Sequence, residues 1–505
     1  MITLNQPSTA PHLLPPTIRE VRYVVQAQMK SMEELQEEVQ RAFGSQLRPE
    51  DLLSLSKKLQ VEFKEHLITS PQCMLPSHNY VLPTGKEHGT YLALEVGGST
   101  LRVALVDLDG LGGPESLGIR SIESFPIPMD VRRRGDLGFF DWIAARIRDM
   151  LAADEIAQNH KPNPEPLHMG IAWSFPIDQT SIRTGNILGM GKGFRCSKAV
   201  TGLDLNELIT DVCQRAGLNI CLDAIVNDSS AALLSRAYVD PSTRLALILG
   251  TGINAAIHLP IASLHPSKFG KRSMPAADEV ANVLVNTELS MFGKKAYPTT
   301  RWDELVNCKH IMPDYQPMEY LVAGPYMGEI TRLILLEASE TTGLFGGKLP
   351  PSLMSNYTLD ARILAAIETD SSPGLLSSRR LFHKHHPNNE FPNFSDMQFV
   401  QQVTRVVSRR SCAYATAGIH ALASLLEDME SSHQIVSTDA DSINIGCDGS
   451  IINKYPDYMD KVQASLDQMI RLEDNISRKR VVLEKTVEPA VSGAGVAVAM
   501  AAAAP

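Results

Sequence analysis

The stretch YLALEVGGSTLRV, residues 91–103, decides which fold we expect of this chain. A short apolar strand ends at the carboxylate of Glu95, and two glycines, two hydroxyl residues and then Arg102 follow after it. Gly97 and Gly98 carry no Cβ, so the backbone N–H groups of such a turn can approach a phosphate. Glu95 is placed to hold a Mg²⁺ that accompanies the phosphates. The same pattern is also typical of an ordinary β-hairpin.

Two further turns of the same kind lie far along the chain. Residues 245–256 read LALILGTGINAA, and residues 442–450 read SINIGCDGS. Each is an apolar run followed by a glycine turn, which is common in isolation. Three of them spread over one chain indicate two halves that close on one nucleotide. Strands that alternate with helices predict an α/β protein with this duplicated layout.

The composition is that of a globular protein large enough for two or more domains. The chain has 505 residues, of which 44% are hydrophobic and 21% are charged. Its formal net charge of −10 argues against broad binding to a nucleic-acid backbone, which requires a basic face. The net charge does not bear on small anionic ligands, because local N–H groups can hold them.

The seven cysteines predict reduced thiols rather than a structural zinc site. They are scattered along the chain, and no pair has the CxxC spacing. The opening sequence MITLNQPSTAPHLLPP lacks the basic and apolar regions of a signal peptide. No window reaches the roughly 18 apolar residues that cross a bilayer. We therefore expect a cytoplasmic protein that does not enter a membrane.

Apolar spacing predicts most of the helices. We expect a loose Pro-rich arm over residues 1–16, followed by helices over residues 17–43 and 49–64. The histidines of RRLFHKHHPNNEFPNF, within residues 371–395, lack a second ligand set, so a solvated basic loop is favoured over a metal cluster. Later helices are expected at residues 139–153, 204–216, 319–337, 360–369 and 399–426.

A series of motifs resembles, in its order, the eukaryotic, fungal-type hexokinase family. MLPSHNYVLPTGKEHGTYLALEVGGSTLRV resembles the family's phosphate segment, and SFPIDQTSIRTGNILGMGKGF resembles its sugar-binding segment. VNDSSAALLS is similar to the segment that bears the catalytic aspartate, and NTELSMFG to an acidic loop that contacts the sugar. GTGINAA and IGCDGSIINKYPDY resemble the second phosphate turn and the adenosine segment. The resemblance runs from about residue 17 to the C-terminus.

The resemblance implies an α/β fold with two actin-like ATPase (ribonuclease-H-like) domains, small and large, flanking an active-site cleft. It implies that helices within residues 17–74 pack on the large domain. The small domain is expected over residues 75–226 and the large domain over residues 227–488. A C-terminal helix, about residues 489–505, is expected to return to the small domain. We expect the cleft to close on sugar, because the base and the phosphate turns lie on different halves.

Phosphoryl transfer to a sugar hydroxyl needs a base, positive charge near the moving group, a metal and positioning. The resemblance implies that Asp228, in VNDSS, is the base and that Lys192, in GKGF, bonds the sugar and brings positive charge. From position alone, Asp228 would be a helix N-cap and Lys192 a solvated loop residue. The sugar-binding residues implied by the resemblance are Ser174, Phe175, Pro176, Gly191, Lys192, Asn227, Asp228, Asn254, Glu288 and Cys308.

The resemblance also implies a set of ATP-binding residues, with Mg²⁺ held by Glu95 either directly or through water. These residues are Glu95, Gly97, Gly98, Ser99, Thr100, Arg102, Gly250, Thr251, Gly252, Gly446, Asp448, Gly449, Ser450, Gly493 and Gly495. Glu95 stands where the family has aspartate, so its longer side chain shifts the metal or its bridging water. The last glycine motif, SGAGVAVAM, has Val496 in place of a basic residue and Ala497 in place of a glycine.

Departures on the sugar side concern specificity. Gly191 replaces the family's threonine before the lysine. Aligning WDELVNCKHIMPDYQPMEY with the family puts Cys308 where a second sugar glutamate is expected. Losing that carboxylate would leave room for a bulkier 2-substituent, such as an N-acetyl group. The cofactors implied are ATP and Mg²⁺, and the partners are a small-molecule sugar and ATP.

Three functions therefore stay open. The first is an ATP-dependent N-acetylglucosamine kinase, which transfers the γ-phosphoryl group to the 6-hydroxyl of an aldohexose. The second is a glucose or general hexose kinase. The third is a hexokinase-like sugar sensor with little catalysis, motivated by Glu95, Val496 and Ala497. The presence of both Asp228 and Lys192 argues against the third, because a sensor has no chemical need for them. The sequence does not indicate an oligomeric state.

Overall fold

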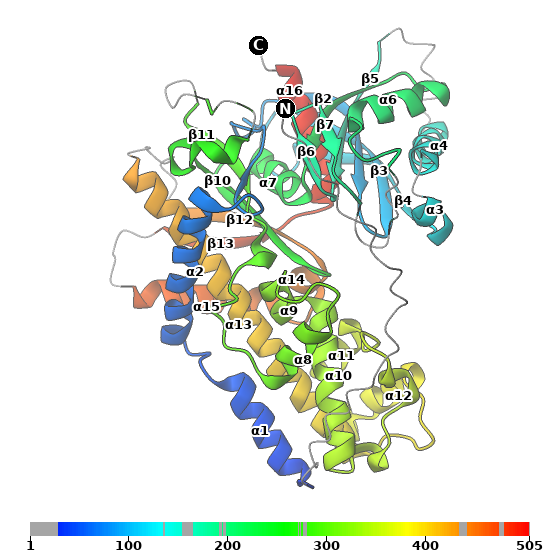
Figure 1. Cartoon of the computed structure of the whole chain (residues 1–505), viewed down its shortest axis with the longest axis vertical. Helices are drawn as coiled ribbons and strands as arrows, with labels where there is room; N and C mark the ends of the chain where they lie inside the picture. The colour runs from blue at the N-terminus through cyan, green and yellow to red at the C-terminus, as the bar shows by residue number, and fades with distance from the viewer. Residues whose placement is uncertain are drawn as a thin grey trace, which may run out of the picture.

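Two β-sheets with helices on their faces form the core of the molecule (Figure 1). The structure is a computed structural model. It describes residues 29–134, 137–153, 165–190, 194, 198–270, 272, 274–275, 280–433, 442–473 and 479–503. Three sets of expected features lie outside the described residues: the arm over residues 1–16, residues 17–28 of the first expected helix, and Gly191 and Lys192 of the sugar segment. The described part of that helix begins at Met32.

The first sheet has five strands in the order β4-β3-β2-β5-β8. Strands β2, β3 and β4 form an antiparallel meander, whereas β2, β5 and β8 run parallel. A cluster of buried apolar side chains joins one face of this sheet to α4 and α6. The bounds are β2 (His88–Val96), β3 (Thr100–Asp109), β4 (Leu117–Pro126), β5 (Leu167–Trp173), β8 (Ile220–Val226), α3 (Met129–Arg134), α4 (Gly138–Ala153) and α6 (Leu205–Arg215).

The second sheet has six strands in the order β1-β11-β10-β9-β12-β13. Apart from β1 it repeats the first sheet, with an antiparallel meander followed by two parallel strands. The repeat agrees with the expected pair of actin-like, ribonuclease-H-like domains. The bounds are β1 (Leu75–Pro76), β9 (Thr243–Leu249), β10 (Ile253–Pro260), β11 (Asn282–Asn286), β12 (Ser442–Asp448) and β13 (Arg480–Lys485).

Each half of the chain lends a helix to the other half. α7 (Asp228–Val239) follows the last strand of the first sheet but packs on strands of the second. α16 (Pro489–Ala503) follows the last strand of the second sheet but packs on β2, β3, β5 and β8 of the first, where Figure 1 shows it in red. The two exchanged helices also pack against each other, so they hold the halves together.

Long helices dominate the large half. α13 (Phe394–Ser432) runs through it and contacts α1 (Met32–Gly44) and α2 (Pro49–Thr69). The other helices are α8 (Arg301–Lys309), α9 (Pro317–Val322), α10 (Gly324–Thr341), α11 (Ala361–Thr369), α12 (Leu376–His385), α14 (Ser450–Lys454) and α15 (Tyr458–Leu472). A short hairpin, β6 (Ile177–Gln179) and β7 (Gly185–Ile187), forms a separate two-stranded sheet. Single turns of 3₁₀ helix cover Ile261–Ser263, Pro266–Phe269, Leu289–Met291, Leu344–Gly347, Pro351–Met354 and Pro373–Leu375.

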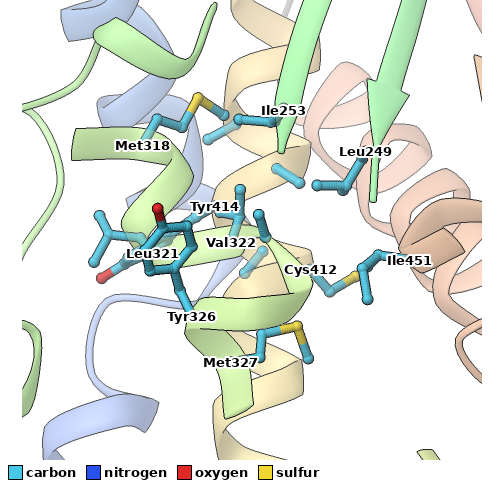
Figure 2. Close-up of a cluster of buried hydrophobic side chains, with 14 of the residues drawn as sticks. Leu249, Ile253, Met318, Leu321, Val322, Tyr326, Met327, Cys412, Tyr414 and Ile451 are labelled. Atoms are coloured by element: carbon cyan, nitrogen blue, oxygen red, sulfur yellow. The ribbon is translucent and has the colours of Figure 1, made fainter. Parts of the chain in front are cut away.

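A buried apolar cluster fixes the end of the β9–β10 hairpin. Figure 2 shows Leu249 and Ile253, on either side of the turn, facing apolar side chains of α9, α13 and α14. Leu249 is fully buried and Ile253 is 3% exposed. The partners labelled in this view include Met318, Leu321, Val322, Cys412, Tyr414 and Ile451. This packing therefore fixes the position of the glycine turn that joins β9 and β10.

Three expectations about this half are wrong. The helix expected over residues 319–337 is two helices, because Ala323 has extended φ/ψ angles between α9 and α10 and Pro325 restarts the chain as a helix. The basic stretch expected as a loop contains α12, whose Phe382 is fully buried. Residues 75–76, expected to begin the small domain, form β1 of the second sheet.

Candidate active site

The carboxyl ends of three parallel strands meet at one edge of the first sheet. β2 ends just after Glu95, β5 leads into Ser174, and β8 leads into Asn227 and Asp228. Ligands of open α/β sheets bind at such an edge. Ser174 N donates to the carbonyl of Val96 at 3.3 Å, and Ser174 Oγ donates to Asp228 Oδ2 at 3.3 Å. The structure thus brings together side chains that the sequence places far apart.

Asp228 is the first residue of α7, but it is not the N-cap. The cap is Asn227, whose Oδ1 accepts from Ser229 N at 2.9 Å and from Ser229 Oγ at 2.7 Å. Asp228 Oδ1 accepts from the same Ser229 N at 2.8 Å, and the side chain stays partly exposed. The first turn of α7 therefore presents the Asp228 carboxylate at the edge of the sheet.

An amide network from the second sheet joins the start of α7. Asn254 Nδ2 donates to Asn286 Oδ1 at 3.0 Å, and Asn286 Nδ2 donates to Glu288 Oε1 at 2.8 Å. Ser229 Oγ donates to Asn286 Oδ1 at 3.4 Å, which links the network to the Asn227–Ser229 turn. Glu288 has a left-handed backbone with φ +54°, a conformation that costs a non-glycine residue free energy and is found at functional sites. Asn286, which holds Glu288, was not among the predicted site residues.

A second carboxylate, that of Glu319, lies beside the β9–β10 turn. Glu319 Oε2 accepts from Ile253 N at 3.2 Å, next to Asn254 in the chain. A Cβ added to Gly252 would lie 2.5 Å from the same oxygen, so glycine is needed for this approach. Sequence reasoning missed Glu319 as a site residue. The signal was its place on the first turn of the helix that Pro317 begins, inside the segment aligned for Cys308.

Cys308 does not lie where the alignment implied. It is exposed, and it occupies the last turn of α8. Just after Cys308, the chain is held at His310, whose Nδ1 forms a hydrogen bond with Tyr320 Oη at 2.8 Å. The carboxylate that approaches the amide network is that of Glu319. The expected replacement of a pocket glutamate by a thiol is therefore wrong, because the alignment fixed the wrong position for that glutamate.

The wall expected for a sugar follows β5 directly. Phe175 is 5% exposed, and its ring packs 5.2 Å from that of Trp173 and 5.1 Å from that of Phe194, centroid to centroid. Pro176 O accepts from Leu188 N at 3.2 Å, which closes the base of the β6–β7 hairpin. These contacts hold Ser174 and Pro176 at the strand end. The roles of Gly191 and Lys192 stay predictions.

The first glycine turn is the connection of a β-hairpin. Gly97 N donates to the carbonyl of Thr100 at 3.0 Å, and Glu95 and Arg102 are cross-strand partners on either side. The two side chains form an ion pair, and Arg102 Nε lies 3.5 Å from Glu488 Oε2. The carbonyl of Ser99 accepts from Ile127 N at 2.8 Å. Gly98 lies in the same turn. The hairpin and the phosphate-turn interpretations are therefore compatible.

Excess negative charge gathers around Arg102. Burial raises the pKa of Glu95, and the charges of Asp228 and Glu488 raise it further, while Arg102 opposes them. Burial likewise raises the pKa of Asp448, with a contribution from Glu488. Buried carboxylates whose pKa values are raised by their neighbours gain from a divalent cation between them. The donor set fits Mg²⁺, which Glu95 and Asp448 would hold together with the phosphates of a nucleotide.

The second and third glycine turns lie side by side. Gly250 N donates to the carbonyl of Gly252 at 2.9 Å, and Thr251 is exposed at the tip. β9 and β12 are parallel, so the Asp448–Ser450 turn ends at the same edge. Gly449 has φ +120°, and a Cβ there would lie 2.3 Å from Leu249 O. A Cβ on Gly250 would lie 2.9 Å from Ser450 N. The two turns therefore pack closely, as a joint nucleotide surface requires.

Three predicted ATP contacts are packing residues. Gly493 and Gly495 are buried in α16, where added Cβ atoms would lie 1.9 Å from Ala231 O of α7 and 3.0 Å from Val106 Cβ of β3. Gly446 is buried inside β12, where an added Cβ would lie 2.9 Å from the Cβ of Arg236. Their glycine requirement comes from the close approach of helices and strands. Their assignment to ATP stays a prediction. The altered Val496 is fully buried as well.

Comparisons with known proteins agree with this geometry. Two family models, each described as hexokinase, match residues 37–238 and 244–500. Hexokinase-2 of Oryza sativa subsp. japonica is 29% identical over 432 residues, which cover 85% of this chain and 83% of that protein. Hexokinase-1 of Schizosaccharomyces pombe is 27% identical over 461 residues, 90% of this chain and 88% of that protein. A solved hexokinase from Schistosoma mansoni, complexed with glucose, shares the fold with a TM-score of 0.76 at 24% identity, over 93% of this chain and 100% of that chain.

Proposed function

The chain belongs to the hexokinase family, and on that premise we propose that it phosphorylates glucose and related aldohexoses at the 6-hydroxyl. It is a phosphotransferase, and kinases of this family use ATP with Mg²⁺. The observation that carries the proposal is the position of Asp228. Its carboxylate lies where three strand ends meet, between the amide network of the second sheet and the Glu95–Arg102 pair.

Asp228 acts as the general base in this proposal. It takes the proton of the 6-hydroxyl as that oxygen bonds to the γ-phosphorus of ATP and the bond to ADP breaks. Ser174 orients the carboxylate through its hydroxyl at 3.3 Å. Mg²⁺, when bound, supplies positive charge that balances the phosphates. Asn254, Glu288 and Glu319 offer the dense donors and acceptors that buried sugar hydroxyls require.

The positions of Cys308 and Glu319 favour glucose over N-acetylglucosamine as the substrate. The expectation of an acetylated sugar depended on a small thiol lining the pocket, but Cys308 is exposed on α8. Glu319 places a carboxylate next to the turn that carries Asn254. A carboxylate there pairs with ring hydroxyls and leaves less room for an acetyl group. The sensor interpretation loses support too, because Val496 and the glycines of its motif serve packing.

We also propose a cytoplasmic location, since the reaction consumes ATP. The six described cysteines are free thiols, as is common in a reducing compartment. In the part of the chain that the structure describes, no helix combines the length and apolar character required to span a bilayer.

The test is ADP release by the purified chain with a panel of glucose, mannose, fructose and N-acetylglucosamine. We expect the highest kcat/KM with glucose, and we expect Cys308→Glu to leave the order of the sugars unchanged. A higher kcat/KM for the acetylated sugar would overturn the proposed specificity.

In the same assay Asp228→Asn should lower kcat by about 10³-fold, the usual effect of losing a general base. Glucose binding, measured by calorimetry, should persist. The matched control is Asp211→Asn on α6, where the carboxylate is 64% exposed and pairs with Arg215. Turnover of Asp228→Asn at the wild-type rate would refute the proposed base.

A further inference from the structure

Three side chains with metal-binding atoms lie together on the first sheet, away from the catalytic edge. They are His168 on β5 and Cys221 and Asp223 on β8. His168 and Cys221 face each other in register, near the amino ends of the two strands. Ser174 and Asp228 follow the opposite, carboxyl ends of the same strands. The cluster is therefore separate from the site already described.

A β-bulge brings Asp223 into this cluster. Met169 pairs with Leu222 and Gly170 pairs with Ala224, so Asp223 is an extra residue without a register partner. A bulge of this kind redirects a side chain. The Asp223 side chain is only 7% exposed, and its Oδ2 lies 2.6 Å from His168 Nδ1. Cys221 Sγ lies 3.7 Å from Asp223 Oδ1.

We propose that His168, Cys221 and Asp223 bind a thiophilic divalent cation, with Zn²⁺ as the best match. Imidazole nitrogen, thiolate sulfur and carboxylate oxygen are the three ligand types that Zn²⁺ prefers. The three ligand atoms already lie within 4.8 Å of one another. A tetrahedral site needs separations of about 3.3–3.7 Å. Side-chain rotations that move the ligand atoms by about 1 Å would bring them to these separations. Water completes the coordination at the half-exposed His168.

The Cys221 proton must leave when the metal binds. Burial raises the pKa of this thiol, Asp223 raises it further, and Arg183 opposes them. Zn²⁺ displaces the proton into solvent and takes the thiolate. The negative charge of Asp223 that disfavours a thiolate in the free protein favours the cation once it arrives.

Arg183 is an ion-pair partner of Asp223 in the free protein. Its Nη2 lies 3.3 Å from Asp223 Oδ1. Arg183 belongs to the tip of the β6–β7 hairpin, which follows the sugar wall, and Ile225 N donates to the carbonyl of Ile182 at 2.8 Å. Metal and guanidinium compete for one carboxylate, so we expect Zn²⁺ to release Arg183. Metal binding is thereby linked to the segment that leads to the predicted sugar lysine.

Titration of the full chain with Co²⁺, a spectroscopic substitute for Zn²⁺, tests the site without using activity. We expect a near-ultraviolet thiolate-to-cobalt band and visible bands of a tetrahedral ion, abolished by an excess of Zn²⁺. Cys221→Ser should remove the thiolate band and weaken Zn²⁺ binding about 100-fold. Cys308→Ser is the matched control, since it removes an exposed thiol elsewhere and should leave the spectrum unchanged.

Two further variants keep the test decisive if Cys221→Ser folds poorly. His168→Gln alters a side chain that is 49% exposed, so the fold should persist while Zn²⁺ binding weakens. Arg183→Gln removes the competitor and should tighten Zn²⁺ binding by about 5-fold or more. A thiolate band that persists in Cys221→Ser or vanishes in Cys308→Ser would overturn the proposal. Unchanged Zn²⁺ affinity in both His168→Gln and Arg183→Gln would do the same.

Discussion

The two meander hairpins occupy equivalent places in the two sheets, yet they present different chemistry. In the first sheet the penultimate residue of β2, Glu95, pairs across the strands with Arg102. In the second sheet the penultimate residue of β9, Ile248, pairs across with Asn254. One turn therefore carries a partly exposed ion pair, and the other carries an amide that bonds to a neighbouring asparagine.

The surroundings of the two turns differ in the same sense. Arg102 is surrounded by carboxylates that would gain from a metal and phosphates. Gly250 and Gly252 are approached closely by Ser450 and Glu319, so that turn is fixed by contact. The comparison teaches that two copies of one fold can take different tasks. Under the proposed function, the hairpin of the first sheet would supply charge at the nucleotide, and the hairpin of the second sheet would supply hydrogen bonds to the sugar.

The largest effect is expected at the contact that joins the halves. A Cβ on Gly493 would lie 1.9 Å from Ala231 O, a backbone atom that cannot move aside alone. Gly493→Ala should lower the free energy of unfolding by about 3 kcal/mol, at the upper end for overpacking. Gly118→Ala in β4, where a Cβ would meet nothing within 4 Å, is the control for urea unfolding. Equal stability of both variants would show that α7 and α16 do not depend on this contact.

Removing the charge of the first hairpin should mainly affect the nucleotide. Arg102→Met leaves Glu95, Asp448 and Glu488 without their shared cation. We expect kcat/KM for MgATP to fall about 100-fold, as for loss of a buried charged hydrogen bond. The glucose KM should change little. Ile248→Val alters the position of the other hairpin that is equivalent to Glu95, and it should leave the KM for ATP unchanged. If Arg102→Met instead weakened glucose alone, the division of tasks would be wrong.

A smaller effect is expected at the second hairpin, and it should concern glucose rather than ATP. Gly252→Ala puts a methyl group 2.5 Å from Glu319 Oε2, and the flexible carboxylate must move away. The KM for glucose should rise about 10-fold through the lost hydrogen bond, with the KM for ATP nearly unchanged. Gly97→Ala has room, with 3.4 Å to Thr100 O, and should affect only the ATP side. Initial rates at varied glucose and varied ATP distinguish these outcomes.

The smallest effect concerns pH and stability. Burial raises the pKa of Asp448 in the folded protein, so the folded state binds this proton more tightly than the unfolded chain does. The ionised side chain therefore costs stability at neutral pH, and the cost disappears as the pH falls below the ordinary pKa of aspartate. Asp448→Asn should be more stable than the wild type by less than about 1 kcal/mol near pH 7. Urea unfolding at decreasing pH should show the gap closing, and a widening gap would contradict the sign.

Local sequence signals were sufficient to predict much of the fold. The spacing of apolar residues predicted α2, α4, α6, α11 and α13 close to their observed bounds. The strand that ends at Glu95 and the two later glycine turns were placed correctly relative to their strands. Such signals depend on neighbours in the chain, which a sequence displays directly.

Contacts between distant segments could not be predicted in this way. The break at Ala323 and the burial of Phe382 in α12 depend on packing that overrides local pattern. The glycines of α16 resembled a nucleotide motif, but an added Cβ would meet the backbone of α7 at Gly493 and the side chain of Val106 in β3 at Gly495. Glu319 was overlooked, and Cys308 was preferred, because a single alignment column cannot tell an exposed helix end from a pocket. Asn286 has no motif of its own and is identified only by its bonds to Asn254 and Glu288.

The exchange of α7 and α16 has a consequence for how the chain reaches its native state. α16 covers the first sheet, but it is synthesised after every strand of both sheets. During translation the first half therefore keeps an uncovered apolar face, lined by residues such as Ala93, Ala104 and Ala172, until the last helix arrives. The early half can mature only together with the late one, which makes assembly of the two lobes a single cooperative event rather than two successive ones.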